Sequence, residues 1–162
     1  MKNKASGLSF LWLSAVAFIL DLLTKYIVTQ NFELYESVNI LPIFNLTYAR
    51  NTGAAFSFLA DHSGWQKYFF IVLAIVISAV LVYFLKKNSA SQKLQNSAYA
   101  LIIGGALANM VDRAYNGFVV DFFDFYWQDW HYPVFNVADI AICIGAGLLA
   151  LDALKNSEKK KE

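Results

Sequence analysis

The chain is too apolar for an ordinary soluble domain, since 58% of its 162 residues are hydrophobic and only 15% are charged, against roughly 25% charged residues in soluble domains. A formal net charge of +1 gives no general attraction for nucleic acid, and we expect none as a partner. The single cysteine, Cys143, excludes an intramolecular disulfide. Its position inside an apolar run predicts a packed core thiol rather than a nucleophile. We expect one domain, 1–162, in a lipid bilayer, with no metal or cofactor.

Four apolar runs predict an all-α membrane protein with four transmembrane helices, at about 7–28, 68–85, 96–113 and 134–152. The second run carries no charge from Tyr68 to Leu85, which is about one bilayer crossing at ~1.5 Å per residue. The first run follows two lysines and so resembles a signal peptide. It lacks a small-residue cleavage pattern, however, and we interpret it as a retained helix.

Two long connections separate these runs. The first, 29–66, alternates loosely at 34–40 and again at 43–48, with Pro42 between, which predicts a small β element on the membrane surface. A turn is expected at 50–53. The second connection, 114–133, is rich in aromatic residues, and we interpret it as an interfacial loop.

The distribution of basic residues predicts the orientation in the membrane. Four spans place both termini and the connection at 86–93 on one side, and the positive-inside rule makes that side cytoplasmic. Both long connections are then extracytoplasmic. Nine of the thirteen basic residues lie on the predicted cytoplasmic side: Lys2, Lys4, Lys86, Lys87, Lys93, Lys155, Lys159, Lys160 and Lys161.

Placing polar or ionisable side chains in or next to the hydrocarbon of a membrane costs free energy. Such residues in a membrane protein therefore indicate a functional site. Asp121 lies among apolar residues just after the third run, and Asp139 lies at the start of the fourth. Burial and a second carboxylate nearby both raise a carboxyl pKa, so two such groups in contact share one proton. The ionised member then deprotonates a water while the protonated member polarises a peptide carbonyl. We therefore predict a catalytic carboxylate pair.

Each acid also has a structural interpretation. Asn136 followed by Asp139 three residues later is typical of a helix N-terminal cap, which does not exclude catalysis. Asp121 would point to water if it lay in an open loop. Asp21 and Lys25 share one helix face and predict a structural ion pair. Asp124 receives no role.

Further polar residues carry weaker signals. Asn51, Asn109 and Asn136 have the chemistry to satisfy a buried carboxylate or to bind an extended peptide, but they equally suit loop caps and contacts between helices. Arg113, which follows Asp112, suits a helix end or a lipid phosphate as well as a role in chemistry.

Two other kinds of site are disfavoured. The residues do not favour a triad of Ser57 with His62 or His131, because His62 lies in a polar, loop-like stretch. Gly104 and Gly105 predict close helix packing rather than a phosphate loop, since the lysine and strand of a nucleotide site are missing.

The sequence resembles the bacterial lipoprotein signal peptidases, or type II signal peptidases, which are integral-membrane aspartic proteases. The resemblance covers nearly the whole chain, with its motifs in the family's order. One departure is Ala108, where the family usually has glycine before the asparagine. The matching motifs are DLLTK at 21–25, NTGAAFS at 51–57, GGALANMVDR at 104–113, GFVVDF at 117–122 and FNVAD at 135–139.

This resemblance implies specific roles. Asp121 and Asp139 correspond to the catalytic dyad, and Asp21 to a supporting acid. The substrate would be a prolipoprotein whose cysteine carries diacylglycerol, cut on the amino side of that cysteine, and globomycin-type cyclic peptides would inhibit. The expected location is the bacterial cytoplasmic (inner) membrane, with both termini cytoplasmic, the site near the extracytoplasmic face, and a monomeric enzyme. The positions expected to line or support the site are Asn51, Asn109, Asp112, Arg113 and Asn136.

Two other functions remain open from the residues alone. One is a transporter or channel, in which Asp21, Asp112, Asp121 and Asp139 relay ions. The other is a non-catalytic assembly factor that binds lipid headgroups through Arg113. Clustering of the acids at one face favours the peptidase over a conduit. For the peptidase we also expect the segments 52–63 and 126–130 to cover the bound peptide.

Overall fold

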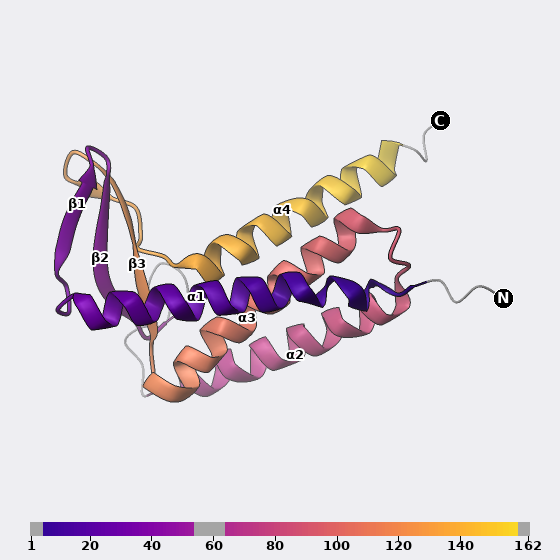
Figure 1. The fold of residues 1–162 in the computed structure, drawn as a ribbon, viewed down its shortest axis with the longest axis horizontal. Helices are drawn as coiled ribbons and strands as arrows, with labels where there is room; N and C mark the ends of the chain where they lie inside the picture. Colours follow the sequence, from indigo (N-terminus) through magenta and orange to yellow (C-terminus); the bar gives the residue numbers. More distant parts are fainter. Residues whose placement is uncertain (1–4, 54–63, 159–162) are drawn as a thin grey trace.

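The computed structural model describes residues 5–53 and 64–158. Four long helices run beside one another with a small sheet at one end, and α1 begins and α4 ends at the opposite end (Figure 1). A short 3-10 turn, η1 (Gly7–Phe10), precedes the first helix. The helices are α1 (Leu11–Asn31), α2 (Trp65–Lys87), α3 (Lys93–Asn116) and α4 (Val137–Glu158).

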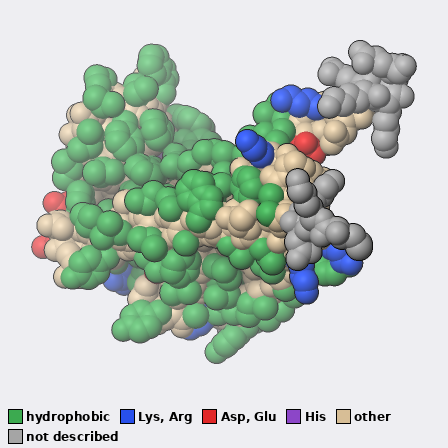
Figure 2. Space-filling view, turned by 45° about the vertical axis from the view of Figure 1, so that its right-hand side comes forward, with side chains coloured by type: hydrophobic (Ala, Val, Ile, Leu, Met, Phe, Trp, Pro, Cys, Tyr) green, Lys and Arg blue, Asp and Glu red, His purple; other side chains and the backbone are tan. Residues whose placement is uncertain are grey.

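Within the described residues, three helices are long and apolar enough to cross a membrane: Gly7–Asn31, Trp65–Lys87 and Val137–Ser157. Most of their side chains point away from the protein interior, and hydrophobic side chains cover much of the visible face (Figure 2). The protein is therefore a helical membrane protein. The predicted third span corresponds to α3, which is not among these three helices because its sequence is more polar. The structure therefore supports three of the four predicted spans.

Helix α3 occupies the centre of the bundle and contacts each of the other three helices. Glycines allow this close approach. A Cβ atom at Gly104 would lie 2.6 Å from the carbonyl oxygen of Ser14 on α1, and one at Gly105 would overlap the carbonyl oxygen of Ala138 on α4. The predicted role of these two glycines in close helix packing is confirmed. Small residues at such contacts are typical of membrane helix pairs.

The sheet is antiparallel with the order β1-β2-β3-β4. Strands β1 (Ser37–Leu41) and β2 (Phe44–Asn51) form a hairpin around Pro42, which confirms the predicted β element. Strand β3 (Val119–Trp127) pairs with β2, and β4 (Trp130–His131) extends the edge. A small cluster of Val28, Tyr48, Val120 and Phe122 packs the end of α1 against this sheet.

The interpretation of 114–133 as a loop is wrong, because its central part is β3. The first four residues of β3 are all buried, so hydrophobic and polar residues do not alternate there as they do in a strand with one wet face. Gly117 makes the connection from α3: its φ of 84° ends the helix in the left-handed region, where glycine has no steric cost. The chain then turns directly into β3.

Asp124, for which the sequence predicts no role, ties the strands of the sheet together. Its carboxylate accepts hydrogen bonds from Thr47 Oγ1 at 2.9 Å and Asn45 Nδ2 at 3.3 Å on β2, and it pairs with His131 Nδ1 at 2.7 Å on β4. Burial raises the pKa of Asp124, but the hydrogen bonds from His131, Thr47 and Asn45 together outweigh burial, and the pKa lies below its ordinary value. Asp124 is thus a structural carboxylate.

Two glycines of α4 give a matched test of the packing. A Cβ at Gly145 would lie 2.8 Å from the carbonyl oxygen of Ala98 on α3, whereas one at Gly147 would meet nothing within 4 Å. Gly145→Ala should therefore lower the free energy of unfolding by about 1–3 kcal/mol, while Gly147→Ala should leave it unchanged or slightly raise it. Thermal unfolding in detergent measures both. Equal stability of the two variants would contradict the observed α3–α4 contact.

Candidate active site

The two candidate acids line one cavity of about 520 Å³, where the sheet meets the ends of α3 and α4. This volume lies within the range of ordinary ligand-binding clefts. Part of the wall is polar and part is apolar, the latter including Ile140, Cys143 and Ile144 along α4. Five of the eight predicted site residues line the cavity: Asn51, Asn109, Arg113, Asp121 and Asp139.

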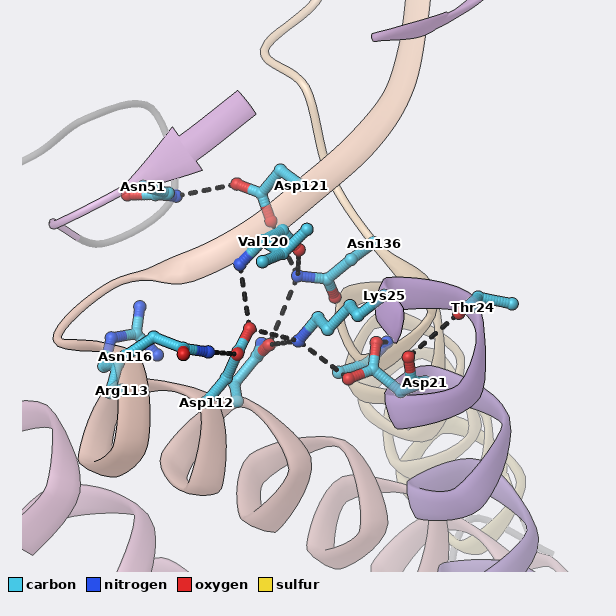
Figure 3. A network of polar contacts seen from close by, with 12 residues as sticks. Asp21, Thr24, Lys25, Asn51, Asp112, Arg113, Asn116, Val120, Asp121 and Asn136 are labelled. Carbon is cyan, nitrogen blue, oxygen red and sulfur yellow. Dashed lines mark hydrogen bonds and ion pairs between the residues drawn. The ribbon is translucent and has the colours of Figure 1, made fainter. Parts of the chain in front are cut away.

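Asp121 is the third residue of β3, and its side chain is held by amides from two other segments. Asn51 on β2 donates from Nδ2 to Oδ2 of Asp121 at 3.0 Å, and Asn136 donates from Nδ2 to Oδ1 at 2.6 Å (Figure 3). Only 2% of Asp121 is exposed. The alternative of an open-loop acid pointing to water is therefore wrong.

Asp139 lies in the first turn of α4. Its backbone N–H donates to Oδ1 of Asn136 at 2.9 Å, and its own Oδ2 accepts from the backbone N–H of Asn136 at 3.2 Å. This reciprocal arrangement is the predicted capping box, which is confirmed. Oδ1 of Asp139 also accepts from Nδ2 of Asn109 at 2.9 Å. The cap thus fixes the carboxylate without removing it from the cavity.

The electrostatics of Asp121 differ from those of an exposed acid. Burial raises its pKa, and the neighbouring charge of Asp139 raises it further. Hydrogen bonds from Asn51 and Asn136 lower it, and the net result is a pKa of about 7. Asp121 therefore keeps its proton up to neutral pH. A protonated carboxyl beside a second carboxylate can act as an acid while its partner acts as a base.

Lys25 is the centre of a polar network next to the candidate acids, and Figure 3 shows its contacts with Asp21 and Asp112. Its ammonium group lies 2.7 Å from Asp21 Oδ2 and 3.3 Å from Asp112 Oδ2, and it donates to Asn109 Oδ1 at 2.8 Å. The predicted ion pair of Asp21 and Lys25 is confirmed. Lys25 is not among the predicted site residues, because its partners on α3 are more than 80 residues away in the sequence.

The two acids of this network do not line the cavity, but each binds the backbone beside a candidate acid. Asp112 Oδ2 accepts from the N–H of Val120 at 2.8 Å, and Asp21 Oδ1 accepts from the N–H of Ala138 at 2.7 Å. Asn136 joins the network from the other side, donating to Asn109 Oδ1 at 3.2 Å. The arrangement suits Asp21, Asp112 and Asn136 to support, rather than to contact, a bound molecule.

Arg113 is directed to the chain that follows β2. Its Nη2 donates to the carbonyl oxygen of Gly53 at 2.8 Å, and its guanidinium lies over the ring of Phe70, 4.9 Å from the centroid. Asn51 Oδ1 accepts from the N–H of Gly53 at 3.0 Å, so two cavity residues hold the same turn. Arg50 and Asn51 still belong to β2, so the expected turn at 50–53 is limited to a bend at 52–53, next to Asn51 in the cavity wall.

Other expectations for this region have mixed outcomes. Ser57, His62 and most of the proposed covering segment 52–63 lie outside the described residues. His131 pairs with Asp124 in the sheet and does not line this cavity. The cavity wall after β4 is formed by 132–135 rather than by 126–130.

The prediction of a packed core thiol at Cys143 is wrong, because Cys143 is exposed and lines the cavity. The sequence misleads here for a physical reason. In water an apolar run indicates burial, but in a bilayer apolar side chains face the lipid at no cost. Hydropathy alone therefore does not distinguish the core of this protein from its surface.

The fold and the site define a helical membrane protein with a cavity lined by two carboxyl groups, of which Asp121 is buried and Asp139 is partly buried. The family model for signal peptidase (SPase) II matches residues 13–155, and the chain belongs to this family.

Individual relatives agree. A lipoprotein signal peptidase of Actinobacillus succinogenes is 85% identical over 158 residues, covering 98% of this chain and 97% of the relative. One of Haemophilus influenzae is 83% identical over 159 residues, covering 98% and 92%. A bacterial membrane enzyme solved by the in meso method at 2.3 Å resolution has a TM-score of 0.84 at 35% identity, covering 95% of this chain and 92% of that one.

Removal of the Lys25 charge tests the network. Lys25→Met leaves Asp21 and Asp112 as buried carboxylates without a counter-ion, which should lower the free energy of unfolding by about 3–5 kcal/mol. Thermal unfolding in detergent measures the loss. Adding Asp21→Asn to Lys25→Met should restore part of the stability, because one uncompensated charge is then removed. A double variant no more stable than the single one would show that the charges are not coupled.

Proposed function

We propose that Asp121 and Asp139 are the catalytic pair of a membrane aspartic endopeptidase. The activity follows from the family: the chain is a lipoprotein-processing peptidase that removes the signal peptide from prolipoproteins. By the same family relationship, it cuts diacylglyceryl-modified substrates on the amino side of the lipidated cysteine. The observation that carries the catalytic assignment is the placement of both acids on one cavity, with a pKa of about 7 for Asp121.

The proposed reaction needs one proton on the pair. Protonated Asp121 donates a hydrogen bond to the oxygen of the scissile carbonyl, and ionised Asp139 removes a proton from water. The water oxygen attacks the carbonyl carbon while Asp121 passes its proton to the carbonyl oxygen, which gives a tetrahedral intermediate with two hydroxyl groups. The carbon–nitrogen bond then breaks as the proton held by Asp139 passes to the leaving nitrogen, and Asp121 recovers its own proton.

The supporting residues orient this pair. Asn51 and Asn136 hold Asp121, and Asn109 holds Asp139. Asp21 and Asp112 fix the backbone next to each acid. Arg113 holds the turn at the cavity edge through Gly53, from where its positive charge also acts on a bound peptide.

The apolar wall of the cavity suits the lipid of the substrate. Ile140 and Ile144 lie on α4, a candidate membrane span, and 51% of Ile144 is exposed. Acyl chains gain about 0.8 kcal/mol for each methylene that stays in hydrocarbon. The diacylglyceryl chains would therefore lie along this face of α4 while the peptide bond next to the modified cysteine reaches the two acids. An unmodified precursor lacks this anchor.

The membrane arrangement is also a proposal. Helix α3 is the fourth span, because α1, α2 and α4 surround it and screen its polar side chains from lipid. The lysines at the helix ends away from the sheet support a cytoplasmic position for both termini and a cavity near the extracytoplasmic face of the inner membrane. One chain supplies both acids, so the enzyme acts as a monomer. Globomycin-type cyclic peptides would occupy the same cavity.

Substitution of each acid tests the pair. Asp121→Asn and Asp139→Asn should each lower turnover of a diacylglyceryl-modified prolipoprotein by about 10²- to 10⁴-fold, because neither amide can transfer the proton. A gel-shift assay with purified protein in detergent measures cleavage, with the unmodified precursor as the uncleaved reference. Asp129→Asn, an exposed acid in the β3–β4 turn, is the matched control and should retain activity. Near-wild-type turnover in either dyad variant would remove that residue from the pair.

The pH dependence of kcat/KM tests the shared proton. Because the pKa of Asp121 is raised to about 7, its proton is present below that pH and lost above it. The value of kcat/KM should fall as the pH rises through about 7. The hydrogen bond from Asn51 lowers this pKa, so Asn51→Ala should move the falling limb to higher pH. A flat profile from about pH 6 to 9, or a shift to lower pH in the variant, would contradict the assignment.

A further inference from the structure

A second cavity, of about 450 Å³, lies between α1, the end of α3 and the sheet. It shares no lining residue with the candidate active site. Lys25 and Asp112 line it, whereas Asn109, to which Lys25 donates, lines the first cavity. The two cavities therefore lie on opposite sides of the same polar network. The catalytic proposal gives the second cavity no role.

The second cavity contains a cation that is held in place but not neutralised. The guanidinium of Arg50 lies over the ring of Phe118, 4.5 Å from the centroid, and over that of Tyr48 at 5.6 Å. Its Nε donates to the hydroxyl of Tyr48 at 3.2 Å. In the part of the chain that the structure describes, no carboxylate lies within ion-pair distance of Arg50. The terminal nitrogens of this exposed side chain are left to bind an anion.

The other basic side chains near the site are already engaged. Lys25 is paired with two carboxylates and is 3% exposed. Arg113 donates to Gly53 and lies on the other cavity. Asp112, the acid in the second cavity, accepts from Lys25, Val120 and Asn116. An anion entering the second cavity would therefore meet the charge of Arg50.

The surroundings indicate which anion this is. Leu22 and Tyr26 line the cavity from α1, a candidate membrane span, and 62% of Tyr26 is exposed. Tyr115, on α3, is 90% exposed at the rim. Tyrosines with an apolar ring and a polar tip are typical of the headgroup level of a bilayer. The cavity thus continues from a polar, basic end onto a hydrocarbon-facing helix surface.

We propose that the second cavity binds a bilayer phospholipid, with its phosphodiester on Arg50 and its acyl chains along α1 over Leu22 and Tyr26. A guanidinium presents paired donors that match two phosphate oxygens. Stacking on Phe118 and Tyr48 holds the guanidinium in place before the lipid arrives, so little side-chain entropy is lost on binding. This site is separate from the substrate cavity and does not depend on the assignment of the catalytic pair.

Native mass spectrometry of the full-length protein, delipidated in detergent and titrated with phosphatidylglycerol, tests the proposal. Arg50→Ala should weaken the tightest lipid-binding step by about fivefold, the effect of about 1 kcal/mol per basic side chain at a lipid surface. Arg50→Lys should recover part of the loss, because it keeps the charge without the paired donors. Lys93→Ala, an exposed cation at the start of α3 and at the far end of the bundle, is the matched control and should bind like the wild type.

Two outcomes would overturn the proposal. Unchanged lipid affinity in Arg50→Ala, or an equal loss in Lys93→Ala, would show that Arg50 forms no specific site. Competition with inorganic phosphate distinguishes a site for phospholipid from a site for free phosphate. We expect excess phosphate to displace little lipid, because phosphate gains nothing from the α1 surface, and displacement at equal concentrations would instead show a phosphate site. Circular dichroism of each variant confirms folding, and if Arg50→Ala does not fold, Arg50→Gln replaces it.

Discussion

The buried ammonium group of Lys25 determines how the candidate active site is assembled. An isolated charge in such a place would cost several kcal/mol in lost hydration, and Asp21, Asp112 and Asn109 offset that cost. The two carboxylates are themselves only partly neutralised by one ammonium group. They therefore require N–H donors as well. Asp112 takes the N–H of Val120, and Asp21 takes that of Ala138. Those two residues immediately precede Asp121 and Asp139, so neutralising one cation fixes the positions of both acids.

The contacts made directly to the acids come from amides rather than from cations. Asn51 and Asn136 bind Asp121, and Asn109 binds Asp139. An arginine or lysine in direct contact would stabilise the ionised form and lower the pKa of Asp121 far below neutrality. An amide orients a carboxyl group with a much smaller electrostatic effect. Asn109 accepts a hydrogen bond from Lys25 and donates one to Asp139. The position of Lys25 therefore helps to fix that of Asp139 without a direct ion pair between them.

The features that the sequence predicted are those encoded by short spacings. Asp21 and Lys25 are one helical turn apart, and Asn136 with Asp139 is a local capping pattern. The partners of Lys25 on α3 and the pairing of β3 with β2 join residues about 70 to 90 positions apart, and no local pattern records such contacts. Strand β3 was missed because its first residues are buried on both faces. The exposure of Cys143 was missed because lipid, rather than water, surrounds α4.

The polar network also explains why the two cavities described above, both formed by the described residues, differ in chemistry. Side chains that must pair with Lys25 come from α1 and α3, and they hold the ends of these helices at the sheet. On one side of the network, Asp121 and Asp139 line a cavity beside the apolar face of α4. On the other it leaves Arg50 beside the apolar face of α1. Both cavities thus join a polar end to a hydrocarbon-facing helix, a shape that fits a molecule with a headgroup and acyl chains. The carboxyl pair of the first cavity can act as an acid and a base in hydrolysis. The guanidinium of Arg50 in the second cavity neither releases nor accepts a proton at neutral pH, so its role there is to bind an anion through its N–H groups.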